Sequence, residues 1–164
     1  MAIKNQTIVT AEKGKQEVFI IREFDAPREL VFKAFSNVEF LEQFFAPENR
    51  VTKYEYGNIH DNGSYRYSTL DENGKILCTF KGVVHEVAAP ERIIQTAEFE
   101  GLPVKGHVVL EKMTFESLPN NRTNLTIHDV CMSVADRDMM VTADMEKGLG
   151  EIFNHLDSLL LKGF

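Results

Sequence analysis

The C-terminal segment, Asp136 to Phe164, constrains the fold of this chain more than any other segment. It contains no proline, and its apolar residues recur at steps of three and four. Those residues are Met145, Leu149, Ile152, Phe153, Leu156, Leu159 and Leu160. This spacing predicts one long amphipathic helix, which Ser133 or Asp136 can cap at its start. Because only one side of such a helix is apolar, the rest of the chain must supply an apolar surface that covers it.

Much of the chain before this helix alternates between polar and apolar residues with a period of two, which is typical of β-strands. Short turns separate most neighbours, and Asn73-Gly74 supplies the positive φ that a tight hairpin needs. The sequence therefore predicts a first strand followed later by an antiparallel meander. The expected strands are residues 16–24, 51–56, 63–70, 76–87, 93–99, 107–116 and 122–132.

Two short helices are expected between the first strand and the meander. Pro27 suits the first turn of a helix, where its missing N–H costs nothing. Ser36 and Glu39 have the spacing of a capping box, so a second helix should begin there. Pro47 should end it. Each of these helices has one apolar side rich in phenylalanine, which must also face the interior.

Together these elements predict an α+β fold in one domain, residues 16–164, after a flexible N-terminal arm of residues 1–15. A curved antiparallel sheet of about six to seven strands would wrap around the long C-terminal helix. The two short helices would follow the first strand. Because a curved sheet and a straight helix do not fit flush along their full length, the space between them is either filled by large side chains or kept as a cavity.

The composition excludes several classes of protein. The net charge is −7 and the Lys and Arg residues are scattered singly, which argues against nucleic acid as a partner. No apolar run approaches the roughly 18 residues of a membrane span, and the N-terminus shows no secretory signal. Cys78 and Cys131 are expected to be thiols rather than a disulfide. We therefore expect a cytoplasmic protein.

No catalytic or metal-binding motif stands out in the sequence. The five histidines form no compact metal spacing, and no serine elbow, P-loop or dinucleotide fingerprint occurs. Glu98, Glu100, Glu111 and Glu116 are interpreted as solvated carboxylates on the outer faces of strands. We therefore predict no catalytic residues, no metal and no cofactor.

Four segments in this order resemble the START-like superfamily, also called SRPBCC. They are "IIREFDAPRELVFKAFSNVEFLEQFF", "DNGSYRYSTLDENGK", "FKGVVHEVAAPERIIQTAEF" and "DMEKGLGEIFNHLDSLL". Within the superfamily they are similar to the branch related to the C-terminal domain of the activator of the heat-shock-protein-90 ATPase. The resemblance implies a helix-grip fold with a mostly apolar internal cavity. The family often carries tryptophan where this chain has Phe44 or Phe45, and again at Leu149.

The resemblance leaves three functions open, because its members include carriers, cyclases and co-chaperone domains. The absence of catalytic motifs favours a protein that binds a small apolar, aromatic or lipid-like ligand, as a monomer or homodimer. A polyketide cyclase-like or hydrolase-like enzyme is the alternative, and it would need an inward-facing His, Arg or carboxylate with a shifted pKa. The third is an interaction domain that activates a chaperone ATPase.

Candidate ligand-binding residues are the large apolar side chains expected around the cavity, together with two arginines that interrupt apolar strands. They are Phe40, Phe44, Phe45, Tyr65, Tyr67, Phe80, Phe99, Val109, Met132, Met145, Leu149, Phe153, Arg22 and Arg66. Either arginine can anchor an acidic headgroup if it points inward, or can cover the sheet with its aliphatic stem if it points outward.

Overall fold

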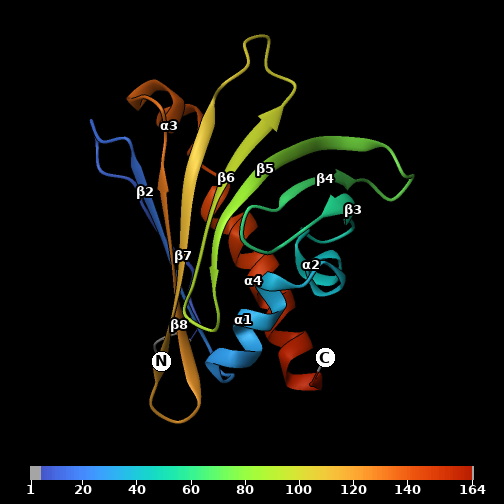
Figure 1. Ribbon diagram of the computed structural model, residues 1–164, viewed down its shortest axis with the longest axis vertical. Helices are drawn as coiled ribbons and strands as arrows, with labels where there is room; N and C mark the ends of the chain where they lie inside the picture. Colours follow the sequence, from blue (N-terminus) through green and yellow to red (C-terminus); the bar gives the residue numbers. More distant parts are fainter. Residues whose placement is uncertain (1–4, 164) are drawn as a thin grey trace.

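The computed structural model describes residues 5–163, which form one antiparallel sheet and four helices (Figure 1). The helices are α1 (Arg28–Ser36), α2 (Val38–Phe44), α3 (Val134–Met140) and α4 (Met145–Lys162). The strands are β1 (Ile8–Thr10), β2 (Glu17–Phe24), β3 (Val51–Gly57), β4 (Ser64–Leu70), β5 (Ile76–Ala88), β6 (Arg92–Glu100), β7 (Val108–Leu118) and β8 (Arg122–Val130). The expected α+β helix-grip class is confirmed.

The sheet has the strand order β1-β2-β8-β7-β6-β5-β4-β3. Strands β3 to β8 form the expected meander, and β2 joins it by pairing with the last strand, β8. The sheet has eight strands rather than six or seven, because residues 8–10 pair with β2. These residues belong to the segment predicted as an arm, and residues 1–4 of that arm lie outside the described residues.

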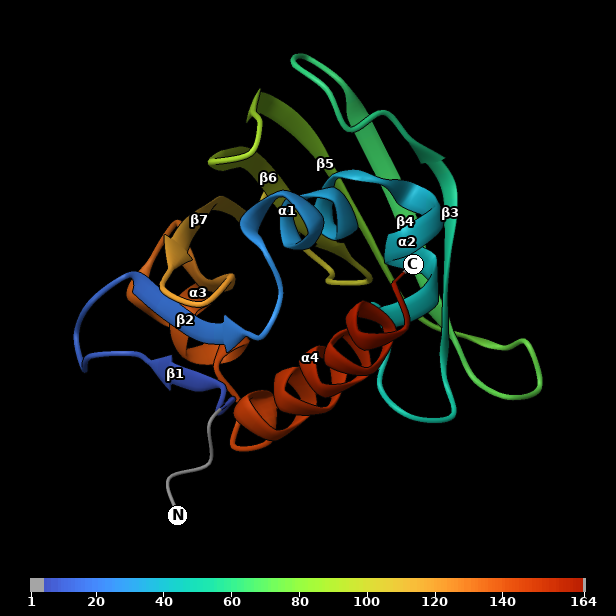
Figure 2. The same cartoon turned by 90° about the horizontal axis from the view of Figure 1, so that it is seen from below.

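The sheet curls around the helices, as Figure 2 shows from below. There α4 spans the open side of the curl, while α1 and α2 lie within it. Phenylalanine rings fill the space between these helices and the sheet. Phe153 of α4 contacts Phe24 of β2 at 5.8 Å between ring centroids, and Phe35 of α1 contacts Phe115 of β7 at 5.6 Å. This edge-on packing is the favourable geometry for aromatic rings, and it fixes α1 and α4 on the sheet.

The second short helix begins one residue later than the sequence indicated. Asn37 caps α2, and its side-chain oxygen accepts hydrogen bonds from the backbone N–H groups of Glu39 and Phe40 at 2.9 and 3.4 Å. The predicted cap, Ser36, is instead the last residue of α1. Asn37 has the extended backbone that a cap needs, and it is the only residue between the two helices.

The prediction of one unbroken C-terminal helix is wrong, because the segment forms two helices. Ser133 caps α3 by accepting from the N–H of Asp136 at 3.0 Å, and α3 ends where Val141 turns extended. A second helix, α4, starts at Met145. Its apolar stripe is as expected, with Ile152, Phe153, Leu156 and Leu160 buried. In Figure 1, α3 lies near the upper end of the sheet, while α4 runs towards the opposite end.

An ion pair between a buried arginine and a half-buried aspartate ties α4 to the sheet. Arg22 of β2 is only 1% exposed, and its guanidinium donates to Asp157 and to Asn154 Oδ1, the latter at 2.9 Å. It also donates to Thr7 Oγ1 at 3.1 Å. Arg22 therefore fixes the position of α4 rather than pointing to solvent.

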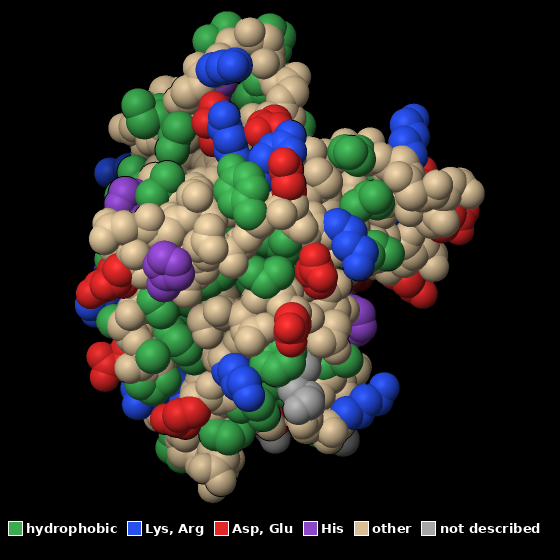
Figure 3. Space-filling model, turned by 45° about the vertical axis from the view of Figure 1, so that its right-hand side comes forward, with side chains coloured by type: hydrophobic (Ala, Val, Ile, Leu, Met, Phe, Trp, Pro, Cys, Tyr) green, Lys and Arg blue, Asp and Glu red, His purple; other side chains and the backbone are tan. Residues whose placement is uncertain are grey.

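The outer surface is mixed in character. On the face shown in Figure 3, the described Lys and Arg side chains lie singly or beside Asp and Glu, interspersed with hydrophobic groups. Among residues 5–163, no helix combines the length and the apolar character that a bilayer crossing requires. The features that distinguish this molecule therefore lie inside the curl of the sheet.

Candidate functional site

A cavity of about 430 Å³ lies inside the curl of the sheet. Side chains of all strands from β3 to β8 line it, together with residues of α1, of α3, and of α2 with the residue that follows it. No residue of α4 is among the described lining residues. The cavity therefore lies beside the packed core of α4, and not between α4 and the sheet, where the sequence placed it.

One wall of the cavity is aromatic. Tyr67 lies at its centre, with the ring of Phe80 stacked at 5.5 Å and that of Tyr65 at 6.1 Å. Phe45, just after α2, meets Tyr67 edge-on at 6.0 Å. Phe99 extends the wall by contacting Phe80 at 5.4 Å, and it is 38% exposed. Flat rings presented by neighbouring strands suit an aromatic or apolar guest, because they offer a large contact area with few rotatable bonds.

Tyr65 is held in place by its partner strand. Its hydroxyl donates to the backbone carbonyl of Thr96 at 2.6 Å, and burial raises its pKa well above the ordinary value. Gly82 lies directly opposite in the register of β4 and β5. A Cβ at Gly82 would lie 1.9 Å from the Thr96 carbonyl oxygen and 2.5 Å from Tyr65 Oη. Glycine at this position is what allows the tyrosine to lie across the strand.

We predict that Gly82→Ala lowers the free energy of unfolding by about 1–3 kcal/mol, the usual range for overpacking. Either the Tyr65–Thr96 hydrogen bond or the strand pairing must give way. Urea denaturation measures the loss, and Gly148→Ala in α4 is a matched control because a Cβ there meets nothing within 4 Å. The control should raise stability by up to about 1 kcal/mol. Equal stability of Gly82→Ala and the wild type would contradict the close approach.

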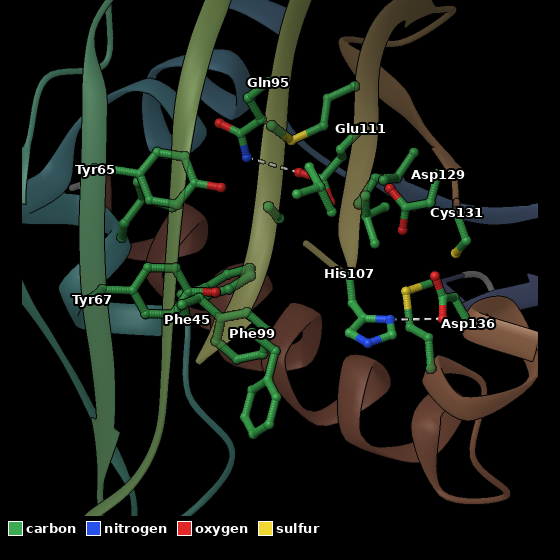
Figure 4. Close-up of a pocket in the computed structure, with 18 of the residues that line it drawn as sticks. Phe45, Tyr65, Tyr67, Gln95, Phe99, His107, Glu111, Asp129, Cys131 and Asp136 are labelled. Atoms are coloured by element: carbon green, nitrogen blue, oxygen red, sulfur yellow. Dashed lines mark hydrogen bonds and ion pairs between the residues drawn. The ribbon is translucent and has the colours of Figure 1, made fainter. Parts of the chain in front are cut away.

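Opposite the aromatic wall lie two carboxyl groups. Glu111 of β7 and Asp129 of β8 are direct partners in the strand register, and both line the cavity (Figure 4). Gln95 of β6 donates from Nε2 to Glu111 Oε1 at 2.8 Å. Asp129 is only 5% exposed, and its Oδ1 has no hydrogen-bond partner among the described residues. A buried polar atom left without a partner is costly, so it marks a place where a ligand can contribute a hydrogen bond.

Burial controls the charge of this pair. Desolvation raises the pKa of Asp129 to about 9, and repulsion by Glu111 adds to the rise. Desolvation also raises the pKa of Glu111, while the hydrogen bond from Gln95 opposes the rise. Because the pKa of Asp129 is raised to about 9, the pair retains at least one proton at pH 7. Such a pair can both donate and accept a hydrogen bond in an apolar setting.

A second polar contact lies at the α3 side of the cavity. His107, just before β7, contacts Asp136 of α3 through Nδ1 and Oδ1 at 2.8 Å (Figure 4). This contact ties α3 to the sheet beside the exposed side chains of Met139 and Phe99, which also line the cavity. No described lining residue is Lys or Arg. Residues 5–163 also contain no group of three His, Cys, Asp or Glu side chains placed to hold a metal ion.

The structure brings some of the predicted ligand-binding residues together. The predicted residues that line the cavity are Phe45, Tyr65, Tyr67, Phe80, Phe99 and Val109. All but Phe45 come from β4 to β7, where the period-two alternation indicates which side chains point into the curl of the sheet.

The other predicted residues lie elsewhere. Phe44 and Phe153 are fully buried in the helix-side core, against which Met145 and Leu149 pack. Phe40 lies beneath the ammonium group of Lys33 at 5.3 Å, and Met132 is 66% exposed. Arg22 is engaged with Asp157, and Arg66 pairs with Glu55 and Glu100, the latter at 2.8 Å. Apart from Met132, which is exposed to solvent, these residues make contacts that stabilise the fold and do not line the cavity.

The interpretation of Glu111 as a solvated carboxylate is wrong, because it lines the cavity beside Asp129. The signal was present in the strand alternation. Glu111 shares parity with the buried Met113 and Phe115, and Asp129 shares parity with the buried Leu125 and Ile127. An acid at an inward position of a strand is the pattern that identifies it. Of the other three glutamates, Glu116 is exposed, Glu100 pairs with Arg66, and Glu98 lies 3.8 Å from Lys81.

Comparison with solved structures agrees with this architecture. A protein from Rhodobacter sphaeroides superposes with a TM-score of 0.84 at 18% identity, covering 96% of this chain and 99% of its own. A protein from Arthrobacter aurescens superposes with a TM-score of 0.81 at 23% identity, and the match covers 94% of this chain and 91% of that protein. DynU16, described as a protein of the dynemicin biosynthetic locus, gives 0.65 at 18% identity, covering 91% of this chain and 48% of its own. At these identities the likeness shows the fold alone.

Comparison of the sequence identifies the family. No curated protein matches the chain. A family model described as Activator of Hsp90 ATPase homolog 1-like protein matches residues 25–161, from the start of α1 through nearly all of α4. The match includes every strand that lines the cavity. The protein therefore belongs to the Activator of Hsp90 ATPase homolog 1-like family.

Proposed function

We propose that this protein binds a small apolar or aromatic molecule in the cavity enclosed by β3 to β8 and α1 to α3. The observation that carries the proposal is the combination of one aromatic wall with an unpartnered carboxyl oxygen on Asp129. Small-molecule sites are typically about 300–1,000 Å³, mostly apolar, and fitted with a few convergent polar groups. A volume of about 430 Å³ lies within that range.

The arrangement of the core supports the same proposal. Phe24 of β2 and Phe153 of α4, which stabilise the fold, pack on each other away from the cavity lining. Tyr65, Tyr67, Phe80 and Phe99 instead line the cavity. A protein interior is normally packed densely, so a hollow of this size with exposed Phe99 at its edge favours a binding role.

Filling the cavity should weaken binding of an apolar probe. We expect Val109→Trp to weaken the affinity for the neutral dye Nile red by at least about tenfold, which corresponds to about 1.4 kcal/mol. Leu110→Trp is the matched control, because Leu110 is the next residue of β7, lies outside the cavity lining and is 47% exposed. Fluorescence titration gives both affinities. The same affinity in the two variants, or no dye binding by the wild type, would contradict the proposal.

A cyclase-like enzyme is a second candidate, favoured specifically by the facing carboxyl groups of Glu111 and Asp129. In an apolar site, a carboxylate can remove a proton next to a ketone while the neighbouring carboxyl group protonates the ketone oxygen. The product of that step is the enol, and both protons are accounted for. DynU16, which has a similar fold, belongs to a biosynthetic locus, and that setting is consistent with chemistry on small molecules.

This second candidate predicts catalysed enolisation. Proton NMR in D₂O would follow loss of the α-hydrogens of 2-tetralone, a small aromatic ketone. The wild type should accelerate this exchange relative to buffer, and Asp129→Asn should not. Exchange at the buffer rate in the presence of wild-type protein that binds the ketone would contradict the enzyme hypothesis and leave the binding hypothesis in place.

A further inference from the structure

We propose that the ligand is an aromatic amine whose positively charged ammonium group binds to Glu111 and Asp129. This inference rests on the proposed function and narrows its ligand class. The sequence alone left the charge of the ligand open, and its candidate anchors, Arg22 and Arg66, would have favoured an acid. Neither arginine reaches the cavity.

The charges around the cavity favour a cation. Its described lining contains three carboxyl groups, Glu111, Asp129 and Asp136, and no Lys or Arg. The single basic side chain of this described lining, His107, is already in contact with Asp136 at 2.8 Å. A carboxylate ligand would lose its hydration next to acids with no cation to compensate it, which is strongly unfavourable. The net charge of −7 adds a long-range attraction for cations.

The hydrogen-bonding capacity of the pair also fits an ammonium group. Gln95 donates to Glu111 Oε1 at 2.8 Å, whereas Asp129 Oδ1 is a buried acceptor without a partner among the described residues. An ammonium group carries three donors and no acceptor, so it can bond to both carboxyl groups at once. A hydroxyl group has one donor, so it can bond to both carboxyl groups only while one of them keeps its proton and donates to the hydroxyl oxygen. When both groups are ionised, only the ammonium group can donate to both of them.

The aromatic wall suits the rest of such a molecule. Phe99, Phe80 and Tyr67 form a continuous row of rings against which a flat apolar body can stack. In Figure 4, Tyr65 and Tyr67 lie on the opposite side of the cavity from Asp129. A molecule with an aromatic body at one end and an ammonium group at the other can therefore span the distance between wall and acid pair. Ring faces also attract cations that lie over them.

Binding of a cation should displace the proton that the free pair holds. Burial raises the pKa of Asp129 to about 9, so this group keeps its proton near neutral pH, and burial raises the pKa of Glu111 as well. An ammonium group supplies a compensating positive charge, so about one proton is expected to leave. The other titratable and charged groups described near the pair come from five parts of the chain. They are Tyr54 of β3, Tyr65 and Tyr67 of β4, His107 before β7, Cys131 after β8, and Asp136 and Arg137 of α3. Arg137 is engaged with the Glu12 carbonyl and Asp138.

Calorimetry with three matched probes tests the inference. The probes are 2-(2-naphthyl)ethylamine, 2-(2-naphthyl)ethanol and 2-naphthylacetate, which share one aromatic body and differ in the charge of the end group. We expect the amine to bind at least about tenfold more tightly than the alcohol and the acetate to bind weakest of the three. Titrations of the amine at pH 7.5 in phosphate and in Tris should differ in heat by the release of about one proton per site.

Variants identify the groups responsible. Asp129→Asn and Glu111→Gln should each lower the binding affinity for the amine by at least about thirtyfold. The affinity for the alcohol should change by less than about threefold. Glu116→Gln is the matched control, since it removes the same charge from the exposed side of the same strand, and it should leave both affinities unchanged. Circular dichroism establishes that each variant is folded. Two independent variants keep the test valid if one of them fails to fold.

The outcomes separate the two proposals. If the alcohol or the acetate binds as tightly as the amine, the inference is overturned and the binding function stands. The inference is also overturned if Glu116→Gln lowers the affinity for the amine as much as Glu111→Gln does. The effect would then come from the overall charge of the protein and not from the acid pair. If the wild type binds none of the three probes and does not bind Nile red, the proposed function fails and the inference fails with it.

Discussion

Replacing Asp129 by Asn should raise the free energy of unfolding at pH 7 by about 2–4 kcal/mol. Asp129 is 5% exposed, and burial raises its pKa to about 9, so the folded protein holds a proton there that the unfolded chain releases near pH 4. Keeping that proton at pH 7 costs free energy, and an amide of the same shape removes the cost. The substitution should stabilise the protein but lower its affinity for the ligand, which is the usual trade-off at a functional site.

The sign of the effect depends on pH. Because the pKa of this acid is raised by folding, its contribution is neutral below the unfolded pKa of about 4. It becomes increasingly unfavourable as the pH rises towards the folded value of about 9. The stability difference between Asp129→Asn and the wild type should therefore be near zero at pH 4 and largest at pH 9. Urea denaturation at pH 4, 7 and 9 measures it, and a difference that is independent of pH would contradict the buried acid pair.

Replacing Asp157 by Ala should lower the free energy of unfolding by about 3–5 kcal/mol. The guanidinium of Arg22 is 1% exposed and has Asp157 as its charged partner, with Thr7 and Asn154 supplying neutral hydrogen bonds. Removing the carboxylate leaves a buried positive charge uncompensated, which is far more costly than losing an exposed pair. Both proposals leave this pair outside the cavity, so ligand binding per folded molecule should not change.

An exposed ion pair provides the control for this prediction. Glu55 pairs with Arg66 but is 60% exposed, so Glu55→Ala should change stability by less than about 1 kcal/mol. The double variant Arg22→Met, Asp157→Leu removes both charges and should recover most of the loss, since an apolar pair can replace a buried ion pair. If Asp157→Ala is no more destabilising than Glu55→Ala in urea denaturation, then the buried charge of Arg22 does not need Asp157 to neutralise it.

Much of the fold follows from local sequence patterns, and the exceptions have identifiable causes. Period-two alternation and the Asn-Gly turn locate the meander because each strand pairs with its neighbour along the chain. The break between α3 and α4 is different, since Val141 to Asp144 contains neither glycine nor proline. The break lies between two tertiary contacts, that of Asp136 in α3 with His107 and that of Asp157 in α4 with Arg22. We attribute the break to these contacts, which local sequence patterns do not reveal.

The candidate site was only half visible in the sequence for a similar reason. The aromatic wall was found because tyrosine and phenylalanine at inward positions of neighbouring strands identify it directly. The carboxyl pair was missed because acids in strands usually face water, and Glu111 lies opposite Asp129 only through the register of β7 and β8. The location of the cavity was also misplaced. The stripe of α4 packs tightly against the sheet through Phe153 and Leu156, so the hollow remains beside it.

The central claim is that a small molecule binds between the aromatic wall and the acid pair. NMR of the protein with the tightest of the three naphthyl probes tests it most directly, through nuclear Overhauser contacts between probe and protein protons. We predict contacts from the naphthyl ring to Tyr67, Phe80 and Phe99, with the largest amide shifts at Glu111 and Asp129. Contacts confined to α4 or to the exposed side of β7, with the Tyr67 ring and both acids unaffected, would contradict the account.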